Sequence, residues 1–181
     1  MRDVLLVAAT ERELGGHEGL VCGVGPVEAA AATARALALD PPRVVLHVGV
    51  AGARGLAARS LVIGAEAVYC DVAAAIPVVE RAAADARLVE AARRAVPDAA
   101  ILPIGTSAAV GGVDHHVPVE AMEGFGVLRA AALAGVPAVE VRAISNDVGE
   151  DDRGRWDIPG AIEALHRVLP ALLAELSTTR G

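Results

Sequence analysis

The chain has 181 residues, the usual size of one domain with a substantial core, so we expect a single domain over residues 1–181. Its net charge of −7 and its aromatic content of 2% argue against nucleic-acid binding, which needs basic surfaces and stacking aromatic rings. No apolar run is long enough to cross a membrane, and the start MRDVLLVAATERE turns acidic too early for a signal peptide. We therefore expect a cytoplasmic protein with no membrane partner, whose two cysteines, Cys22 and Cys70, are reduced core thiols.

The first segment with a clear pattern is residues 3–9 (DVLLVAA), a short apolar run that predicts a buried strand. Thr10 follows it, and the spacing between Thr10 and Glu13 is that of a capping box at the start of a helix. Two interpretations of Glu13 stay open. Its carboxylate either caps a short helix or projects from the edge of the first strand into a ligand crevice.

A second short strand is predicted over residues 20–24 (LVCGV), and Pro26 then opens an Ala-rich helix, because proline suits the first helical position. The pair Gly23 and Gly25 resembles the start of a dinucleotide-binding turn. The third glycine of that turn is missing, since the position holds Glu28. We therefore expect no nucleotide cofactor, and no cofactor of another kind is indicated.

Residues 43–55 (RVVLHVGVAGARG) predict a buried strand that runs into a glycine-rich turn, where the backbone can approach a ligand closely. His47 lies inside this strand and is interpreted as a core histidine with satisfied hydrogen bonds. Further elements are predicted in chain order: a strand over 61–69 with a break at Gly64, a helix over 85–95, a strand over 99–105, a strand over 138–145 and a helix over 157–176 kinked at Pro170. Residues 71–84 are ambiguous.

This alternation of buried strands and helices predicts the fold class. We expect an α/β protein with three layers (α/β/α) around a central mixed, mostly parallel sheet, because buried parallel strands need helices on both faces. The run Asp114-His115-His116 superficially suggests a metal cluster. Adjacent histidines rarely converge on one ion, and no second ligand group has a matching spacing, so we predict no metal site.

The most informative stretch is residues 119–155. Glu123 precedes an Ala-rich helix, and a turn leads into the strand AVEVRAIS, which ends on the polar residues Ser145, Asn146 and Asp147. In α/β proteins, ligands bind at the carboxyl ends of such strands, so we expect the site there. From chemistry alone, Glu123 is either a solvated carboxylate at a helix start or a buried group with a specific partner.

Residues 122–146 (MEGFGVLRAAALAGVPAVEVRAISN) resemble the ribose- and base-binding region of the purine nucleoside phosphorylase and nucleosidase superfamily. The form EAMEGFG over 120–126 with RAISN over 142–146 is most similar to the futalosine hydrolase family. The resemblance implies a nucleoside phosphorylase-like fold, a homodimer or higher homo-oligomer, and a nucleoside and water as substrates. It also implies roles for single residues: Glu13 as the base that activates water, with Glu11 as an adjacent candidate, and Glu123 with Met122 as the ribose site. Further substrate contacts are implied for Val50, Ala51, Gly52 and Ser145.

Two departures from related patterns refine this expectation. Val50 stands where the superfamily has a hydroxyl residue, and a valine side chain cannot hydrogen-bond phosphate, which disfavours a phosphorylase. Asn146 stands where adenosine-type nucleosidases have Asp. A neutral amide can both donate and accept, which suits a 6-oxopurine such as hypoxanthine.

The implied reaction is hydrolysis of futalosine to hypoxanthine and dehypoxanthine futalosine, a step towards menaquinone. Arg153, with Arg155, is a candidate for binding the benzoate carboxylate of this substrate, and Arg142 is expected to be a structural or subunit-contact cation. The alternatives are a purine nucleoside phosphorylase, an adenosine-type (methylthioadenosine) nucleosidase and a nucleoside-binding module without turnover.

Overall fold

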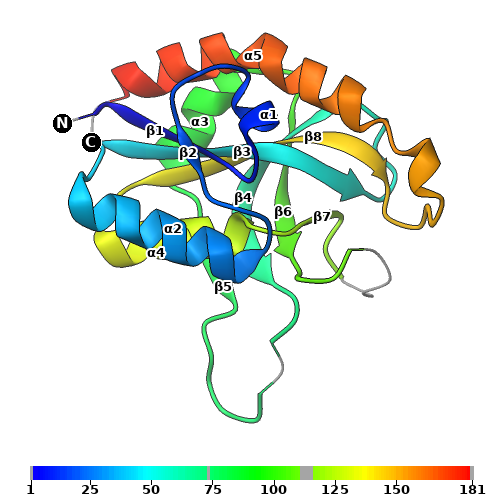
Figure 1. Cartoon of the computed structure of the whole chain (residues 1–181), viewed down its shortest axis with the longest axis horizontal. Helices are drawn as coiled ribbons and strands as arrows, with labels where there is room; N and C mark the ends of the chain where they lie inside the picture. Colours follow the sequence, from blue (N-terminus) through cyan, green and yellow to red (C-terminus); the bar gives the residue numbers. More distant parts are fainter. Residues whose placement is uncertain (1, 73, 111–115, 180–181) are drawn as a thin grey trace.

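The computed structural model describes residues 2–72, 74–110 and 116–179, and these residues form one mixed sheet with helices on both sides (Figure 1). The strands are β1 (Val4–Ala8), β2 (Leu20–Val21), β3 (Val44–Ala53), β4 (Leu61–Tyr69), β5 (Arg81–Ala83), β6 (Ala100–Thr106), β7 (Val119–Ala121) and β8 (Ala138–Asp147). The helices are α1 (Glu11–Leu14), α2 (Pro26–Leu39), α3 (Ala86–Ala95), α4 (Gly124–Ala134), the 3₁₀ turn η1 (Arg153–Arg155) and α5 (Ile158–Thr178).

Strand β3 lies at the centre of the sheet. It pairs in parallel with β1 on one side and with β8 on the other, and β2 continues the sheet in parallel beyond β1. Strand β8 is followed by antiparallel β4, which pairs in parallel with β6, and β7 links β6 back to the end of β3. The pairings β3–β8–β4–β6–β7–β3 thus close a circuit, and the prediction of a mixed, mostly parallel sheet is confirmed.

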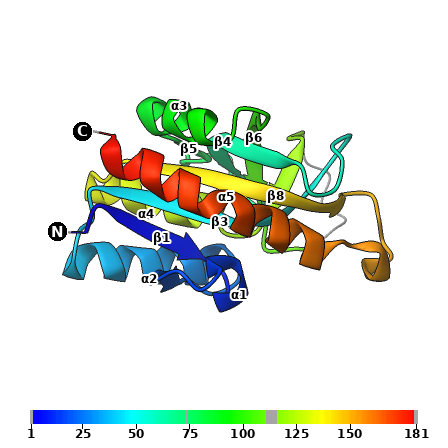
Figure 2. The same ribbon diagram turned by 90° about the horizontal axis from the view of Figure 1, so that it is seen from above.

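Helices α3 and α5 cover one face of the sheet and α2 and α4 cover the other (Figures 1 and 2). Neighbouring residues of one strand point to opposite faces, so Leu6 packs in the cluster under α5 while Leu5 packs in the cluster under α2 and α4. Most of these core side chains are Ala, Val and Leu, which lets the helices approach the sheet closely. The predicted three-layer arrangement is confirmed.

Local signals account for most helix boundaries. Pro26 is the first residue of α2, and the carboxylate of Asp85 caps α3 by accepting hydrogen bonds from the N–H groups of Arg87 and Leu88. Gly135 ends α4 in the left-handed conformation, with φ of 68°. Helix α5 continues through Pro170 to Thr178.

Some predictions needed correction. Strand β5 lies in the segment that the sequence left ambiguous, and β7 was not predicted, because three residues are too few to show periodicity. Cys22 is buried as expected, whereas Cys70 is only half-buried; both are free thiols. Within the described ranges, no helix is both long and apolar enough to cross a bilayer.

The topology decides where a site can form. Strands β1, β3 and β8 run in the same direction, so their carboxyl ends lie at one edge of the sheet. Three segments that are far apart in the sequence meet there: the β1–α1 junction, the end of β3 and the end of β8. The carboxyl edge of adjacent parallel strands is the usual ligand site of an α/β sheet.

Candidate functional site

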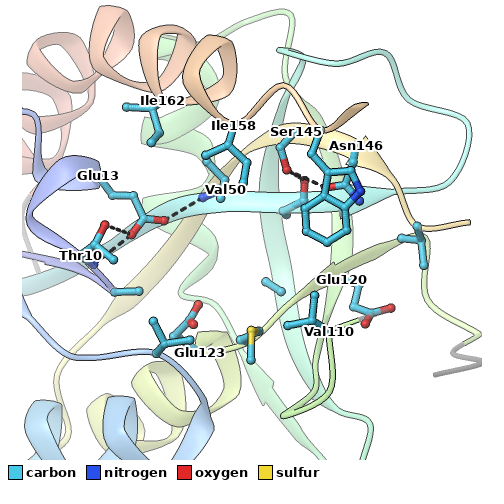
Figure 3. Close-up of a pocket in the computed structure, with 18 of the residues that line it drawn as sticks. Thr10, Glu13, Val50, Val110, Glu120, Glu123, Ser145, Asn146, Ile158 and Ile162 are labelled. Atoms are coloured by element: carbon cyan, nitrogen blue, oxygen red, sulfur yellow. Dashed lines mark hydrogen bonds between the residues drawn. The ribbon is translucent and has the colours of Figure 1, made fainter. Parts of the chain in front are cut away.

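A cavity of about 320 Å³ opens at this edge of the sheet (Figure 3). Its volume is that of a small-molecule site. Eight of the nine site residues predicted from the sequence line it: Glu13, Val50, Ala51, Gly52, Met122, Glu123, Ser145 and Asn146. Arg153 is the exception, because it is exposed and is absent from the described cavity wall. The cavity floor is closed by buried carboxylates, and its mouth is formed by exposed residues such as Val24 and Val110.

Glu13 serves as a helix cap and also faces the cavity, so both interpretations of its sequence pattern hold. One carboxylate oxygen, Oε2, accepts hydrogen bonds from the Thr10 N–H at 3.0 Å and the Thr10 hydroxyl at 2.8 Å. The other, Oε1, accepts from the Val50 N–H at 3.2 Å. The side chain is only 5% exposed. Each oxygen is therefore held in place, which fixes the direction in which this carboxylate can accept a proton.

The peptide group of Val50 connects Glu13 to a buried arginine. Its N–H donates to Glu13, and its carbonyl accepts from Arg142 Nη1 at 3.3 Å. The preceding residue, Gly49, makes this close approach possible. A Cβ atom at Gly49 would lie 2.8 Å from Glu13 Oε1 and even closer to Arg142 Nη1, so a side chain there would displace both groups.

Glu123 is the N-cap residue of α4 and is 4% exposed, so it is a buried carboxylate with specific partners and not a solvated one. Oε1 accepts from the Gly25 N–H at 3.2 Å, and Oε2 accepts from Arg142 Nη2, also at 3.2 Å. The turn after β2 and the middle of β8 thus both hold this carboxylate in the cavity lining, on the opposite side of the cavity from Ile158 and Ile162 (Figure 3).

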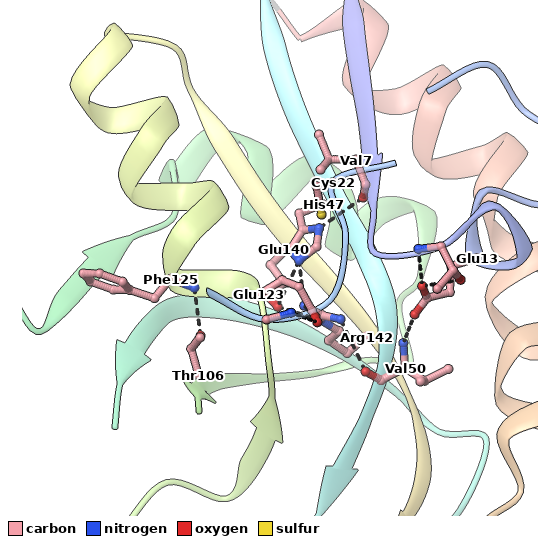
Figure 4. A network of polar contacts seen from close by, with 12 residues as sticks. Val7, Glu13, Cys22, His47, Val50, Thr106, Glu123, Phe125, Glu140 and Arg142 are labelled. Carbon is pink, nitrogen blue, oxygen red and sulfur yellow. Dashed lines mark hydrogen bonds and ion pairs between the residues drawn. The ribbon is translucent and has the colours of Figure 1, made fainter. Parts of the chain in front are cut away.

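Arg142 lies at the centre of a network of polar contacts beside the site (Figure 4). Its guanidinium is 1% exposed and also bonds Glu140 Oε1 at 2.6 Å. Burial alone would lower its pKa, but the surrounding carboxylates of Glu140, Glu123 and Glu13 raise it, so the cation is permanent. Arg142 is therefore a structural cation, as expected, but its burial excludes the subunit-contact role that the sequence left open.

The neighbouring carboxylate, Glu140, is fully buried, and burial raises its pKa although Arg142 acts in the opposite direction. One of its oxygens, Oε2, has no hydrogen-bond partner among the described residues. Gly124, the first residue of α4, lies so close to this carboxylate that a Cβ atom would overlap it. The network is therefore strongly acidic and depends on Arg142 for its compensation.

His47 completes this network and is neutral. Its Nε2 faces Arg142 Nη2 at 2.6 Å, and its Nδ1 faces the Val7 carbonyl at 3.1 Å. Arginine can only donate, so Nε2 is the acceptor and Nδ1 carries the proton. Burial, and then the charge of Arg142, place the pKa of His47 well below its ordinary value. The predicted core role of His47 is confirmed by these contacts.

This shift in pKa predicts how stability depends on pH. Below about pH 6.5 the unfolded chain protonates His47 while the folded protein does not, so acidification favours unfolding. We expect the free energy of unfolding to fall by up to about 1.4 kcal/mol per pH unit from this residue as the pH drops below about 6.5. Urea unfolding of the wild type and His47→Gln, compared between about pH 7.5 and about pH 5.5, isolates the effect. Parallel pH profiles for the two proteins would contradict it.

Ser145 and Asn146 lie at the carboxyl end of β8, beside Gly52 of β3. Asn146 Oδ1 is 2.7 Å from the Ser145 hydroxyl, and its Nδ2 donates to the Asp147 carbonyl at 3.0 Å. An amide nitrogen has two hydrogens and an amide oxygen has two lone pairs, so one donor and one acceptor remain for a ligand. Asp147 is exposed and turns its carboxylate to the Gly149 N–H, away from the described cavity wall.

Several cavity residues were missed from the sequence. Trp156, Ile158 and Ile162 form an apolar wall contributed by the start of α5 and the turn before it. The predicted ligand residue Arg153 lies over the Trp156 ring, with the guanidinium carbon 5.6 Å from the ring centroid. The only available signal was a lone tryptophan shortly after a strand that ends on polar residues, which does not by itself place the ring in the cavity.

Part of the cavity lining comes from residues just before the run Asp114-His115-His116, for which the sequence predicts no metal site. Ala109 and Val110 line the cavity, but residues 111–112, Asp114 and His115 lie outside the described residues. Among the residues that are described, no group of three His, Cys, Asp or Glu side chains is placed to hold a metal ion.

Comparison with known proteins agrees with this architecture. The model of the phosphorylase superfamily matches residues 13–121. Futalosine hydrolase from Acidothermus cellulolyticus is 36% identical over 91% of this chain and 78% of its own length. Futalosine hydrolase from Streptomyces coelicolor is 37% identical over 83% of this chain and 75% of its own. A solved futalosine hydrolase mutant from Helicobacter pylori superposes with a TM-score of 0.85 over 97% of this chain and all of that one, at 17% identity.

Proposed function

The chain belongs to the phosphorylase superfamily and, within it, to the futalosine hydrolase family, and from this membership we propose that it hydrolyses futalosine to hypoxanthine and dehypoxanthine futalosine. The observation that carries the proposal is the pair of buried carboxylates, Glu13 and Glu123, that face one cavity and are held there by separate hydrogen bonds. In menaquinone biosynthesis, this reaction would remove the purine from the precursor.

The chemistry requires three tasks at the sugar and base. Glu13 takes a proton from water while the water oxygen forms a bond to C1′ of the ribose, and the bond from C1′ to the purine nitrogen breaks. Glu123, beside Met122, accepts hydrogen bonds from the ribose hydroxyls, and its negative charge favours the positive charge that develops on the sugar. The leaving purine takes a proton from solvent water as it departs, Glu13 afterwards returns its proton to solvent, and Asn146 donates a hydrogen bond to the imidazole ring of the purine.

The environment of Val50 favours water over phosphate as the nucleophile. Its backbone N–H is already engaged by Glu13, its carbonyl by Arg142, and its side chain has no hydroxyl. A phosphate dianion would also lie against two buried carboxylates, which repel it. Arg142 does not compensate, because its guanidinium is enclosed below the floor by Glu140, Glu123 and His47.

The test is base release followed by chromatography. The purified protein is incubated with futalosine, its 6-amino analogue, inosine and methylthioadenosine, each with and without phosphate. We expect hypoxanthine from futalosine at the same rate in both conditions. Release from inosine only with phosphate would assign the protein to the phosphorylases, and binding without any release would make it a nucleoside-binding module.

Asn146→Asp is predicted to shift the preference from the 6-oxopurine towards the 6-aminopurine substrate. The carboxylate cannot donate a hydrogen bond, so it loses the present bond to the Asp147 carbonyl. Once protonated, it can act as an acid towards the purine ring. The measurement is the ratio of kcat/KM for futalosine to that for its 6-amino analogue. Asn146→Ala is the matched control, because it removes the amide without adding an acid; an unchanged ratio in Asn146→Asp would show that this residue does not select the base.

The homo-oligomer and the cytoplasmic location that the sequence suggests stay predictions.

A further inference from the structure

The mouth of the cavity carries an arginine that the proposed chemistry does not use. Arg12 lies in α1, directly before Glu13, and lines the cavity with an exposed side chain. Within the described ranges, its guanidinium forms no ion pair. Most other arginines of this chain differ in this respect: Arg59 pairs with Asp157 and Arg94 with Glu175. An unpaired cation at the mouth of a cavity with an acidic floor is a ready partner for an anion.

The backbone of Arg12 is fixed by contact with α5. The Nε2 atom of His166 lies 2.7 Å from the Arg12 carbonyl, although the two residues are 154 positions apart. Gly15, which ends α1, has φ of 60° and lies close to the ring of His166. A Cβ atom at Gly15 would be only 2.8 Å from Cδ2 of that ring. Helix α1 is thus docked on α5, and the arginine side chain starts from a defined point at the mouth.

The wall beside this cation suits an aromatic group. Trp156, Ile158 and Ile162 present apolar surface to the cavity, and the indole N–H of Trp156 is bound by the Glu150 carbonyl at 3.0 Å, which holds the ring. Because Glu13, Glu123 and Ser145 close the floor, any part of a substrate beyond its ribose must extend towards the mouth. A substrate group that extends from the ribose towards the mouth would therefore lie against this apolar wall and end near the Arg12 guanidinium.

We propose that Arg12 binds the carboxylate at the end of the substrate's 5′ arm, while the wall formed by Trp156, Ile158 and Ile162 packs against the aromatic ring of that arm. This inference rests on the proposed function, since it takes the substrate to be a nucleoside with an arylcarboxylate arm. Two arginines suggested by the sequence are less suitable. Arg155 is already paired with Glu150 at 3.3 Å and Asp152 at 3.7 Å, and Arg153 lies outside the described cavity wall.

The experiment compares futalosine with its methyl ester, which keeps the ring and removes the negative charge. In Arg12→Met, the ratio of kcat/KM for futalosine to that for the ester is expected to fall by about 10- to 100-fold, mainly through KM, as for the loss of one charge-assisted hydrogen-bond pair. Arg12→Lys should recover part of this ratio. Arg153→Met tests the rival residue, and Arg167→Met, a surface change in α5, serves as the control for nonspecific effects.

Equilibrium binding of dehypoxanthine futalosine is measured alongside, so that the inference does not depend on turnover. Weaker binding to Arg12→Met, by the same factor, supports the role of Arg12. Unchanged binding and an unchanged futalosine-to-ester ratio would overturn it, as would a loss confined to Arg153→Met. The proposed function is tested by a different readout. If the wild-type protein released no hypoxanthine from futalosine but its binding of dehypoxanthine futalosine still depended on Arg12, the proposed function would be wrong while the role of Arg12 would stand.

Discussion

Glu13→Gln is expected to slow hypoxanthine release by about 10²- to 10⁴-fold, which is the usual contribution of a general base. The amide cannot take a proton from water, while its shape still fills the space between Thr10 and Val50. The amide has one oxygen, so it can accept a hydrogen bond from Thr10 or from Val50, whereas the carboxylate accepts from both. The measurement is the single-turnover rate with futalosine, together with the affinity for dehypoxanthine futalosine.

Binding can be followed in this variant without relying on activity. The chain has one tryptophan, and Trp156 lies in the cavity wall, so its fluorescence should report an occupied site. We expect Glu13→Gln to bind the product with nearly normal affinity. Near-normal turnover in this variant would show that Glu13 is not the base.

Thr10→Ala separates the capping role of Glu13 from its chemical role. It removes the hydroxyl that donates to Glu13 Oε2 but keeps the carboxylate. Loss of such a cap costs about 1 kcal/mol of stability, so Thr10→Ala should unfold at lower urea while losing far less activity than Glu13→Gln. If the two variants lost activity equally, the position of the carboxylate, and not its basicity, would be what matters.

The sequence could place Glu13 and Glu123 at one cavity for a physical reason. Both residues lie beside short patterns that are set locally: Glu13 is in the short helix after an apolar strand, and Glu123 is the N-cap residue of α4. Once parallel strands are predicted, their carboxyl ends must meet at one edge, so the ends of β1, β3 and β8 could be placed together without coordinates. The fold class followed from the same alternation of strands and helices.

The buried network beneath the site was harder to predict, although a signal existed. Glu140 and Arg142 are two residues apart in an apolar strand and therefore point to the same face. His47 lies in the strand that pairs with theirs, directly beside Glu140 in the register. His47 and Arg142 were each interpreted singly and Glu140 was not considered, whereas three polar residues on adjacent buried strands indicate one shared network, because buried charges need partners.

The apolar wall at the cavity mouth could not have been found from local patterns. Trp156 follows a polar loop, and Ile158 and Ile162 belong to an amphipathic helix whose apolar face mostly packs on the sheet. Which part of that face reaches beyond the sheet edge depends on the length of the loop and on the docking of α5. These are tertiary features, and the sequence pattern of a helix does not contain them.

Arg142→Met is expected to produce the largest loss of stability, about 3–5 kcal/mol in the free energy of unfolding. The guanidinium bonds the carboxylates of Glu140 and Glu123, the Val50 carbonyl and the His47 ring, and it is itself only 1% exposed. Methionine fills a similar volume but leaves two buried carboxylates without their cation. Urea unfolding at neutral pH measures the effect.

Arg167→Met is the matched control, since it removes an arginine from an exposed pair with Glu163 and should change stability by less than about 0.5 kcal/mol. A loss of less than about 1 kcal/mol in Arg142→Met would contradict the assignment of Arg142 as the cation that stabilises the network.

A second substitution identifies the source of the loss. Adding Glu140→Gln to Arg142→Met removes one of the unpaired buried charges while keeping the shape, so we expect the double variant to be more stable than Arg142→Met alone. If the double variant were less stable by the sum of the two single losses, the cost would come from packing and not from charge. Activity should stay low in either case, because Glu123 and the Val50 peptide both lose the guanidinium that holds them. The arginine that stabilises the core thus also holds the two carboxylates that face the cavity, Glu123 directly and Glu13 through the Val50 peptide.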